Sequence, residues 1–394
     1  MKLFDIIDSK DLTVKWNVVE KLPQFINLKN AQQNPKWHSE GNAFIHTRMV
    51  VESMYKLCPY SYPESTYVVS SDHSYYDRLI LVAAALFHDI GKGETTKWNE
   101  EKGSWSSPRH AIVGEQITRD LLWDEDFRTR ELVCNLVRNH MKPVYMMEHT
   151  NPRKEIIRMS LACPIRLLYT LKTADCSGCI MEKEDNWKEQ LEFFKELAIE
   201  LDCFDHEFKF YNDYSKFKFF QKEDEEFPSE LYDDTEFTIY VMIGIAGSGK
   251  STYINNNLSD YPIVSRDIIR TEIGITKEGD KVRSSKQQES KVSERENELI
   301  KEYCRNKTSF IIDDMNIRRM FRDKTNNMVA PYNPKIVYVY VEAPSFEDNL
   351  ERRKGQIDKN AIKEMRRYLD FPRKEECFSL NFDIQGKGII YGSD

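Results

Sequence analysis

Two spacings of apolar residues divide the chain into a helical part and an alternating part. Up to about residue 205, apolar positions recur every three to four residues, which is the spacing of one face of an α-helix. This pattern predicts helices within residues 46–57, 77–89, 111–123, 128–140, 154–175 and 186–204. From residue 236 onward, β-branched runs predict strands within 238–245, 261–264, 309–314 and 335–341, and the segments 251–258, 293–306, 348–353 and 358–369 predict helices. Apolar strands that alternate with helices favour an α/β fold with a buried parallel sheet.

An acidic segment separates the two parts. Residues 221–235 carry seven acidic side chains and one basic one, include Pro228 and show no apolar period, which is typical of a linker. The aromatic and charged stretch 206–220, just ahead of it, receives no assignment. We therefore expect domains at 1–205 and 236–394, joined by a linker at 206–235. A chain of 394 residues is long enough for two domains.

Composition and charge narrow the class of protein. The chain has 40% hydrophobic and 31% charged residues, which is typical of a soluble globular protein. Residues 236–394 hold 27 basic and 25 acidic side chains, so a generally basic surface that coats nucleic acid is excluded, and any nucleic acid would be held locally, for example at an end. No apolar run reaches the roughly 18 residues of a membrane span. The N-terminus lacks the apolar core of a signal peptide, so we expect a cytoplasmic protein with no membrane partner.

The eight cysteines are scattered, as expected for reduced thiols in the cytoplasm. Cys176 and Cys179 form one CxxC pair, but the sequence contains no second pair to complete a zinc site. We therefore interpret these two cysteines as small residues on a helix.

A phosphate-binding loop follows the first predicted strand of the second part. The residues Gly244-x-x-x-x-Gly249-Lys250-Ser251 match the pattern G-x-x-x-x-G-K-[ST], and they lie between a strand and a helix. Glycines let successive backbone N–H groups face an anion, and the helix N-terminus adds its positive dipole end. Lys250 would reach the β- and γ-phosphates of Mg-bound ATP or GTP, and Ser251 would ligate the Mg²⁺. The residues predicted to contact the nucleotide are Gly244, Gly247, Ser248, Gly249, Lys250, Ser251 and Thr252.

Polar residues after the later strands suggest a phosphoryl acceptor. If Asp267 begins a helix, Arg270 lies on the same face one turn later. The Asp267 carboxylate could then accept the proton of an attacking hydroxyl, and the arginine could hold a phosphate of the acceptor. The alternative is an N-capping aspartate with an arginine in solvent. Asp313 and Asp314 end the strand within 309–314, with Asn316 beyond, where polar groups meet the metal and the acceptor.

A late pair of arginines completes this set. Arg352 and Arg353 lie on the predicted helix 348–353 and could close over the transferring phosphoryl group, with Gly355 as a hinge. As isolated charges they would instead be a solvated helix face.

In their order, GIAGSGKS, SRDIIR, DDMN and ERRKG resemble the motifs of the 5′-OH polynucleotide kinase family. This resemblance implies that Asp267 is the general base, that Arg270 holds the 3′-phosphate of the acceptor, and that Arg352 and Arg353 are lid arginines, although the family usually spaces its lid arginines more widely. The residues that we expect to bind the acceptor are Arg266, Arg270, Asp314 and Asn316.

All eight histidines lie in the first 206 residues, which suggests a site that needs imidazole. His88 and Asp89 end an apolar helix, and similar settings hold the other candidate metal ligands, so that the full set is His46, His88, Asp89, His110, His140 and Asp175. Taken singly, each histidine could be a hydrogen-bonded structural residue. Together these ligands suit one or two ions of Mn, Fe, Co, Ni or Zn, which would orient a phosphate and lower the pKa of a bound water. Lys92, four residues after His88, could contact the phosphate.

The ordered set H…HD…H…H…D resembles the HD phosphohydrolase superfamily, and WHSEGNAFIHTRMV is similar to the HD domain attached to some bacterial tRNA nucleotidyltransferases. The resemblance implies that a first metal is held by His46, His88, Asp89 and Asp175, and a second by Asp89, His110 and His140. His38 and Arg109 are candidate phosphate contacts. His73, His149 and His206 match no motif, and we expect them to be structural.

Together the two halves resemble the bacterial HD-Pnk enzymes, which heal broken nucleic-acid ends. This predicts an all-α HD-type metal phosphohydrolase domain followed by an α/β P-loop kinase domain with a parallel sheet. The first would remove a 2′,3′-cyclic phosphate or 2′-phosphate from an RNA or DNA end, and the second would phosphorylate the 5′-OH, leaving ends that a ligase can use. Two alternatives remain: a P-loop kinase of a small molecule fused to an HD nucleotide phosphohydrolase, and a non-catalytic, nucleotide-gated binding protein.

Overall fold

The computed structural model describes residues 1–34, 38–58, 74–180, 186–275 and 285–385. Contacts within the chain divide it into two compact units, Met1–Lys209 and Phe210–Asp394. The stretch that the sequence left unassigned forms helix α12 (Asp213–Gln221) at the start of the second unit. The rings of Tyr214 and Phe217 on this helix pack against Phe378, so the aromatic residues ahead of the acidic segment belong to the core of the second unit.

The first unit is helical, apart from a short antiparallel hairpin of β1 (Lys97–Asn99) and β2 (Ser104–Ser106) that the sequence did not predict. Its helices are α1 (Leu3–Ile6), α2 (Trp16–Val19), α3 (Pro23–Lys29), α4 (Ala43–Leu57), α5 (Tyr75–Phe87), α6 (Lys92–Thr95), α7 (His110–Leu121), α8 (Phe127–Asn139), the 3₁₀ helix η1 (Lys142–Glu148), α9 (Pro152–Ser160), α10 (Ile165–Ser177) and α11 (Trp187–Glu200). The single helix expected at 154–175 is two helices, because Pro164 disfavours a helical conformation at the residue before it. Within the described ranges, none of the chain's helices has both the length and the apolar character of a membrane span.

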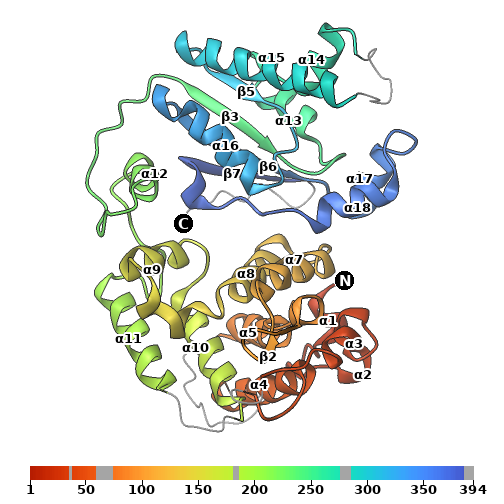
Figure 1. Ribbon diagram of the computed structural model, residues 1–394, viewed down its shortest axis with the longest axis vertical. Coiled ribbons are helices and arrows are strands. Elements are labelled where there is room, and N and C mark those ends of the chain that lie inside the picture. Colours follow the sequence, from red (N-terminus) through yellow and green to blue (C-terminus); the bar gives the residue numbers. More distant parts are fainter. Residues whose placement is uncertain (35–37, 59–73, 181–185, 276–284, 386–394) are drawn as a thin grey trace. The chain divides into compact units, whose positions relative to one another are not determined.

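Helix α5 lies at the centre of the first unit. It contacts α4, α8 and α10 (Figure 1). Every residue from Leu79 to Phe87 is buried. Each large apolar side chain buried in this way contributes about 1.5–3 kcal/mol to folding. At its N-terminus, Ser74 and Asp77 form a capping box. The N-terminus of the helix is therefore capped and its remaining turns are buried, so that His88 and Asp89, which follow its C-terminus, lie in the interior.

The second unit is built on a parallel sheet with the strand order β4-β5-β3-β6-β7. The strands are β3 (Thr238–Ile243), β4 (Ile263–Val264), β5 (Phe310–Ile312), β6 (Lys335–Glu342) and β7 (Ser379–Ile384). The α-helices that follow α12 are α13 (Lys250–Asn257), α14 (Arg266–Glu272), α15 (Lys286–Arg305), α16 (Arg319–Val329), α17 (Phe346–Arg352) and α18 (Lys359–Arg367). Two 3₁₀ turns, η2 (Ala330–Tyr332) and η3 (Lys374–Glu376), complete the elements. The sequence did not predict β7 or α16. The α/β fold with a parallel sheet is confirmed, and because parallel strands share one carboxyl edge, the loops after β3, β4 and β5 meet there (Figure 1).

Candidate active sites

Six side chains from different helices meet in the interior of the first unit. His46 lies on α4 and Asp175 on α10, while His88 and Asp89 directly follow α5. His110 begins α7 and His140 follows α8. Their ligand atoms form two groups with metal-binding geometry, one of His46, His88 and Asp175 and one of Asp89, His110 and His140. The structure thus brings together all six predicted metal ligands.

The carboxylate of Asp89 lies between the two groups. Its Oδ2 atom is 3.3 Å from His88 Nε2 and 3.7 Å from His46 Nε2, and its Oδ1 atom is 3.5 Å from His110 Nε2 and 3.7 Å from His140 Nε2. In the first group, His46 Nε2 is also 3.0 Å from an oxygen of Asp175. Each oxygen of Asp89 therefore faces one group, which is the arrangement of a carboxylate that bridges two metal ions.

The other ring nitrogens of these histidines hold the imidazoles in one orientation. The Nδ1 atom of His88 donates to the Ala85 carbonyl at 2.8 Å, and that of His140 donates to the Val137 carbonyl at 2.7 Å. His110 does the same to Ser107, at 2.9 Å. With Nδ1 protonated, each Nε2 lone pair is directed into the cluster, as metal ligation requires.

A buried carboxylate oxygen without a hydrogen-bond partner indicates whether these residues fit a metal ion. Asp89 is almost fully buried, and its Oδ1 atom has no hydrogen-bond partner among the described residues. A buried carboxylate oxygen without a partner is costly unless a cation binds it. The donor set of imidazole nitrogens and carboxylate oxygens therefore fits one or two divalent transition metals.

Two lysines keep the carboxylates of the cluster ionised. Burial alone would raise the pKa of Asp89, but Lys92, with its Nζ 2.7 Å from Oδ2, holds that pKa well below its usual range. Lys172 has the same effect on the pKa of Asp175, again against burial, at 2.7 Å. Burial lowers the pKa of His110 to about 3, so its imidazole is neutral at physiological pH. We did not predict a role for Lys172 from the sequence, although its position three residues before Asp175 places both on one face of α10.

The remaining candidates of the first unit lie in varied settings. Lys92, predicted to contact a phosphate, binds Gln33 as well as Asp89. Arg109 is exposed just before α7, with a backbone φ of 60°. His38 is half-buried beside Glu40 and Cys179. Glu40 was missed from the sequence. The interpretation of Cys179 as a small residue on a helix is wrong, because α10 ends at Ser177 and Cys179 follows it. His73 lies outside the described residues.

The phosphate-binding loop joins β3 to α13 as the motif predicts. Gly247 and Gly249 have φ values of 78° and 105°, in the left-handed region that favours glycine. A Cβ atom on Gly244 would lie 2.6 Å from both the Ser248 hydroxyl and the Val341 carbonyl, so this turn has no room for a side chain. Lys250 curls back over the loop and donates to the Gly244 carbonyl at 2.9 Å. Burial lowers the pKa of Lys250.

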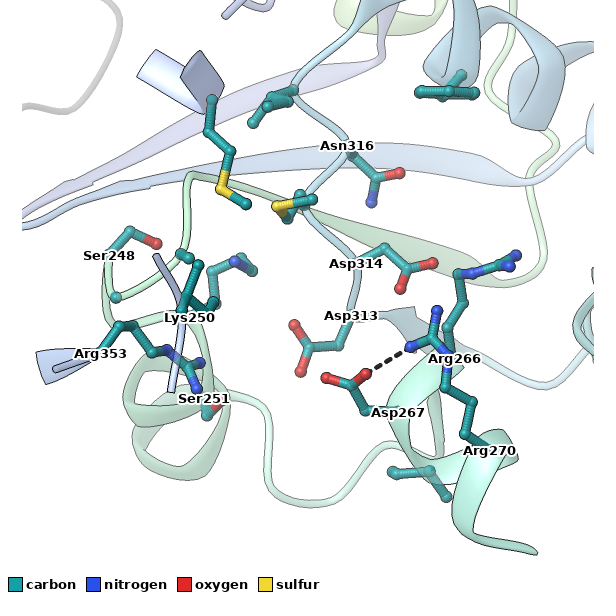
Figure 2. A pocket seen from close by; sticks show the side chains of 18 of the residues that line it. Ser248, Lys250, Ser251, Arg266, Asp267, Arg270, Asp313, Asp314, Asn316 and Arg353 are labelled. Carbon is teal, nitrogen blue, oxygen red and sulfur yellow. Dashed lines mark hydrogen bonds and ion pairs between the residues drawn. The ribbon is translucent and has the colours of Figure 1, made fainter. Parts of the chain in front are cut away.

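Acidic side chains face this loop across the pocket. Figure 2 shows Asp313 and Asp314, which follow β5, together with Asp267 of α14 and Lys250 of the loop. Burial raises the pKa of Asp313, and burial together with the neighbouring Glu296 raises the pKa of Asp314 to about 8. The side chain of Asp267, in contrast, is 83% exposed, so it is accessible to an acceptor.

The two arginines of α14 are held by glutamates of α15. Arg270 donates to Asp267 at 2.6 Å and to Glu289 at 3.0 Å. Arg266 binds Glu289 at 2.7 Å and Glu296 at 2.8 Å. In this arrangement Arg266 fastens α14 to α15, whereas Arg270 lies beside the proposed base; binding of an acceptor by either stays a prediction.

Asn316 and Arg352 contact the backbone around the loop, whereas Arg353, the other predicted lid arginine, does not. Asn316 has a φ of 46° and donates to the Met242 carbonyl at 2.9 Å, so it supports the end of β3. Arg352 donates to the Gly247 carbonyl at 3.1 Å, whereas Arg353 pairs with the exposed Gln356. The structure thus places Arg352 against the loop. Figure 2 shows the side chain of Arg353 beside Lys250 and Ser251.

All of these groups line one open pocket of about 2230 Å³. Typical small-molecule sites occupy about 300–1,000 Å³, so the pocket exceeds the space that one nucleotide needs. Beyond Asp314 it is lined by Arg318, Phe321 and Tyr368, and the Arg318 guanidinium lies 5.0 Å from the centre of the Tyr368 ring. Phe321 and Tyr368 are 52% and 44% exposed, although the Arg318 guanidinium covers one face of the Tyr368 ring.

Comparison with known families identifies both units. A family model described as an HD domain matches residues 43–175, and one described as an AAA domain matches residues 239–372. The chain therefore contains an HD domain and a P-loop kinase-like AAA domain. The HD match covers the metal cluster, and the AAA match covers the phosphate-binding loop, Asp267 and the lid arginines.

Solved structures match part of the chain at low identity and with low TM-scores. They include a protein designated a kinase from Chloroflexus aurantiacus J-10-fl (15% identity, TM-score 0.31), a sugar kinase from Janibacter sp. HTCC2649 (16%, 0.28) and a gluconokinase from Sinorhizobium meliloti 1021 (18%, 0.27). Each match covers 38% of this chain and 86%, 84% and 83% of the other chain, respectively. At these values the likeness carries nothing about substrate. No curated protein matches the chain.

Proposed function

We propose that this chain, in which an HD domain precedes a P-loop kinase-like domain, is a bifunctional enzyme that heals nucleic-acid ends. The kinase domain would transfer the γ-phosphoryl group of Mg-bound ATP or GTP to a 5′-hydroxyl. The HD domain would remove a 2′,3′-cyclic phosphate or a 2′-phosphate. The products would be ends for a ligase, and the reactions suit the cytoplasm, where NTP is abundant.

In the kinase domain, the donor and the acceptor would enter the same pocket from opposite sides. The phosphate-binding loop would hold the donor, with Lys250 leaving the Gly244 carbonyl to reach the β- and γ-phosphates and Ser251 ligating Mg²⁺. Asp267 would accept the proton of the 5′-hydroxyl as the oxygen attacks phosphorus. Arg352, already against the loop, would neutralise charge on the transferring group.

The far end of the pocket supports a polynucleotide acceptor over a small metabolite. Exposed Phe321 offers an aromatic ring, and the Arg318 guanidinium that lies over the Tyr368 ring offers a second planar surface, on which bases can stack. Stacking of a base on an aromatic ring is worth about 1–3 kcal/mol and tolerates any sequence. A small polar metabolite would leave this surface uncovered. The near-neutral charge of residues 236–394 agrees with capture of an end and disfavours coating of a duplex.

In the HD domain, the residues of the cluster would bind metal and position the phosphate. Divalent ions held by the two ligand groups would activate a water molecule and polarise the phosphate. Asp89 is placed to link both ions, and the backbone-anchored histidines keep the ligand set rigid. Lys92 would turn from Gln33 toward a phosphate oxygen, and His38 and Arg109 are further phosphate contacts in this proposal.

The observation that carries the kinase assignment is the position of Asp267, exposed in the same pocket as Lys250 and paired with Arg270 at 2.6 Å.

The test is transfer of labelled phosphate from ATP to a 5′-OH oligonucleotide, to gluconate and to a nucleoside 3′-phosphate, in parallel. We expect transfer to the oligonucleotide, and its loss in Asp267→Asn but not in Asp260→Asn, at an exposed position that does not line the pocket. Transfer to gluconate alone would contradict the proposal and favour a small-molecule kinase.

A further inference from the structure

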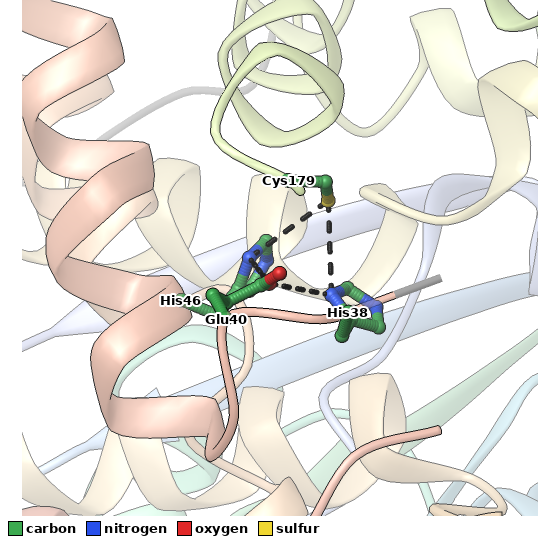
Figure 3. Close-up of side chains that lie close together, drawn as sticks. All are labelled: His38, Glu40, His46 and Cys179. Atoms are coloured by element: carbon green, nitrogen blue, oxygen red, sulfur yellow. Dashed lines mark hydrogen bonds and ion pairs between the residues drawn. The ribbon is translucent and has the colours of Figure 1, made fainter. Parts of the chain in front are cut away.

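A third group of potential metal ligands adjoins the HD cluster. One oxygen of Glu40, Oε1, lies 2.9 Å from His38 Nδ1 and 2.9 Å from His46 Nδ1. The Cys179 sulfur lies 3.7 Å from His38 Nδ1 and 3.8 Å from His46 Nδ1 (Figure 3). The four ligand atoms all lie within 4.8 Å of one another. Neither the HD motif nor the CxxC spacing assigns this group.

Hydrogen bonds and close packing join the two chain segments that carry these residues, the one before α4 and the one after α10. Ser39 donates its N–H to the Ile180 carbonyl at 2.9 Å, and Ile180 donates its own N–H to Glu40 Oε2 at 3.1 Å. Gly178, one residue before Cys179, packs so closely on α4 that a Cβ atom there would lie 2.9 Å from the Val50 backbone. The segment before α4 and the end of α10 are thus fixed to each other, and the ligand atoms are held in place before any ion binds.

The distances match those of a tetrahedral site. Zinc bonds of about 2.0–2.3 Å to nitrogen, oxygen and sulfur place tetrahedral ligand atoms roughly 3.3–3.8 Å apart. The separations of Glu40 Oε1 and of the Cys179 sulfur from the two Nδ1 atoms, 2.9, 2.9, 3.7 and 3.8 Å, lie around that range, with the longer ones involving the larger sulfur atom. Two imidazoles, one carboxylate and one thiolate also form a donor set that zinc prefers. The Glu40 side chain is 1% exposed, and its Oε1 atom faces both imidazoles, so this oxygen is placed to ligate the same ion as they do.

We propose that His38, Glu40, His46 and Cys179 bind a third divalent metal ion, zinc by preference, and that the His46 ring connects this ion to the HD cluster. His46 Nε2 faces Asp175 in the HD cluster, while Nδ1 faces Glu40 and Cys179. Binding requires that Nδ1 of His38, Nδ1 of His46 and the thiol of Cys179 all lose their protons. His38 keeps one proton on Nε2 and binds as a neutral imidazole, while the Nδ1 proton of His46 and the thiol proton of Cys179 go to solvent. Cys179 then binds as a thiolate, and His46, with its Nε2 directed at the HD cluster, as an imidazolate. The ion thereby fixes the orientation of a residue that also belongs to the HD site.

The thiolate gives this site a signature that the HD cluster lacks, because the six HD ligands are nitrogen and oxygen donors. The metal-free full-length protein would be loaded with Co²⁺, and its near-ultraviolet absorption recorded for thiolate-to-cobalt charge transfer. We expect this band in the wild type, its loss in Cys179→Ser, and its retention in Cys176→Ala and Asp89→Ala. Cys176 is the matched control, since it lies three residues earlier on α10 and outside the cluster.

Metal analysis of zinc-loaded protein supplies the second measurement. We expect the wild type to bind one ion per chain more than Cys179→Ser and His38→Ala. A wild-type protein with no thiolate band would overturn the proposal, whether or not the variants fold. So would a stoichiometry that Cys179→Ser leaves unchanged. Glu40 would then serve only as the hydrogen-bond acceptor that orients His46 for the HD metals.

Discussion

Gly91 faces the backbone of His110 so closely that a Cβ atom on Gly91 would overlap the His110 carbonyl oxygen and lie 2.6 Å from the Gly114 amide nitrogen. The φ of Gly91 is −68°, an ordinary value, so glycine is needed here for space and not for conformation. This contact brings the start of α7 against the turn that follows His88 and Asp89. It places His110 Nε2 within 3.5 Å of Asp89 Oδ1.

Substituting Gly91→Ala should therefore damage the HD domain in two ways. The added methyl group should push α7 away, which lowers the free energy of unfolding by about 1–3 kcal/mol. His110 should also move from Asp89, so binding of the second metal should weaken. Thermal unfolding and metal titration measure these effects. Gly93→Ala is the control, because its nearest contacts are 3.2 Å and its effect should be smaller. Equal behaviour of Gly91→Ala and the wild type would refute this role.

The bridging position of Asp89 predicts a selective loss of the phosphohydrolase. Asp89→Asn removes the negative charge that both ligand groups share, so bound HD metal and phosphatase activity should fall by more than about 100-fold. Kinase activity should stay within about twofold of the wild type. Asp202→Asn, at a 90% exposed side chain in the same unit, should change neither activity. If Asp89→Asn silenced both activities in a folded protein, the two sites could not be independent.

The reverse selectivity is expected at Asp267. Asp267→Asn removes the proton acceptor while preserving the shape of the side chain, so the kinase kcat should fall by about 10²–10⁴-fold. ATP should bind with unchanged affinity, because Lys250 and the loop are intact. Single-turnover phosphoryl transfer and nucleotide titration separate these effects. A variant that retains kcat but binds the acceptor weakly would show that Asp267 positions the acceptor and does not take its proton.

The raised pKa of Asp314 predicts that the second unit loses stability as pH rises. Burial and Glu296 raise this pKa to about 8, whereas an aspartate in an unfolded chain titrates near about 4. The folded protein therefore binds the proton more tightly, so the stabilisation is complete below about pH 4 and is lost as pH approaches 8. Asp314→Asn should flatten this dependence, measured as the free energy of unfolding from pH 4 to 8 without nucleotide. The exposed Asp260→Asn should retain the wild-type slope, and a wild-type slope in Asp314→Asn would rule out this source.

The chemistry-bearing residues were predictable from the sequence where they lie next to a regular pattern. His88 and Asp89 follow a long apolar helix, and the phosphate-binding loop lies between a clear strand and its helix, so spacing alone located them. The break between α9 and α10 was harder to predict, because the apolar pattern continues across Pro164. The strand β7 was also harder to predict, because its residues are unevenly buried.

Residues that act through distant contacts were not predictable in this way. Glu40 and Cys179 are 139 positions apart and meet only because Ser39 and Ile180 pair their backbones. The glutamates that hold Arg266 lie on α15, across a segment that carries no motif. Local periodicity reports which face of an element is buried, but it does not report which other element covers that face.

End analysis of a single RNA substrate with a 5′-OH and a 2′,3′-cyclic phosphate tests most directly whether the two sites act on opposite termini of a broken strand. The full-length protein would be incubated with it in the presence of ATP, Mg²⁺ and Mn²⁺ or Co²⁺, and the products resolved by mass spectrometry. We expect a 5′-phosphate and a loss of the cyclic phosphate in the wild type, only the first change in Asp89→Asn, and only the second in Asp267→Asn. A substrate returned with both ends unaltered, while the same preparation phosphorylates a small metabolite, would contradict end healing.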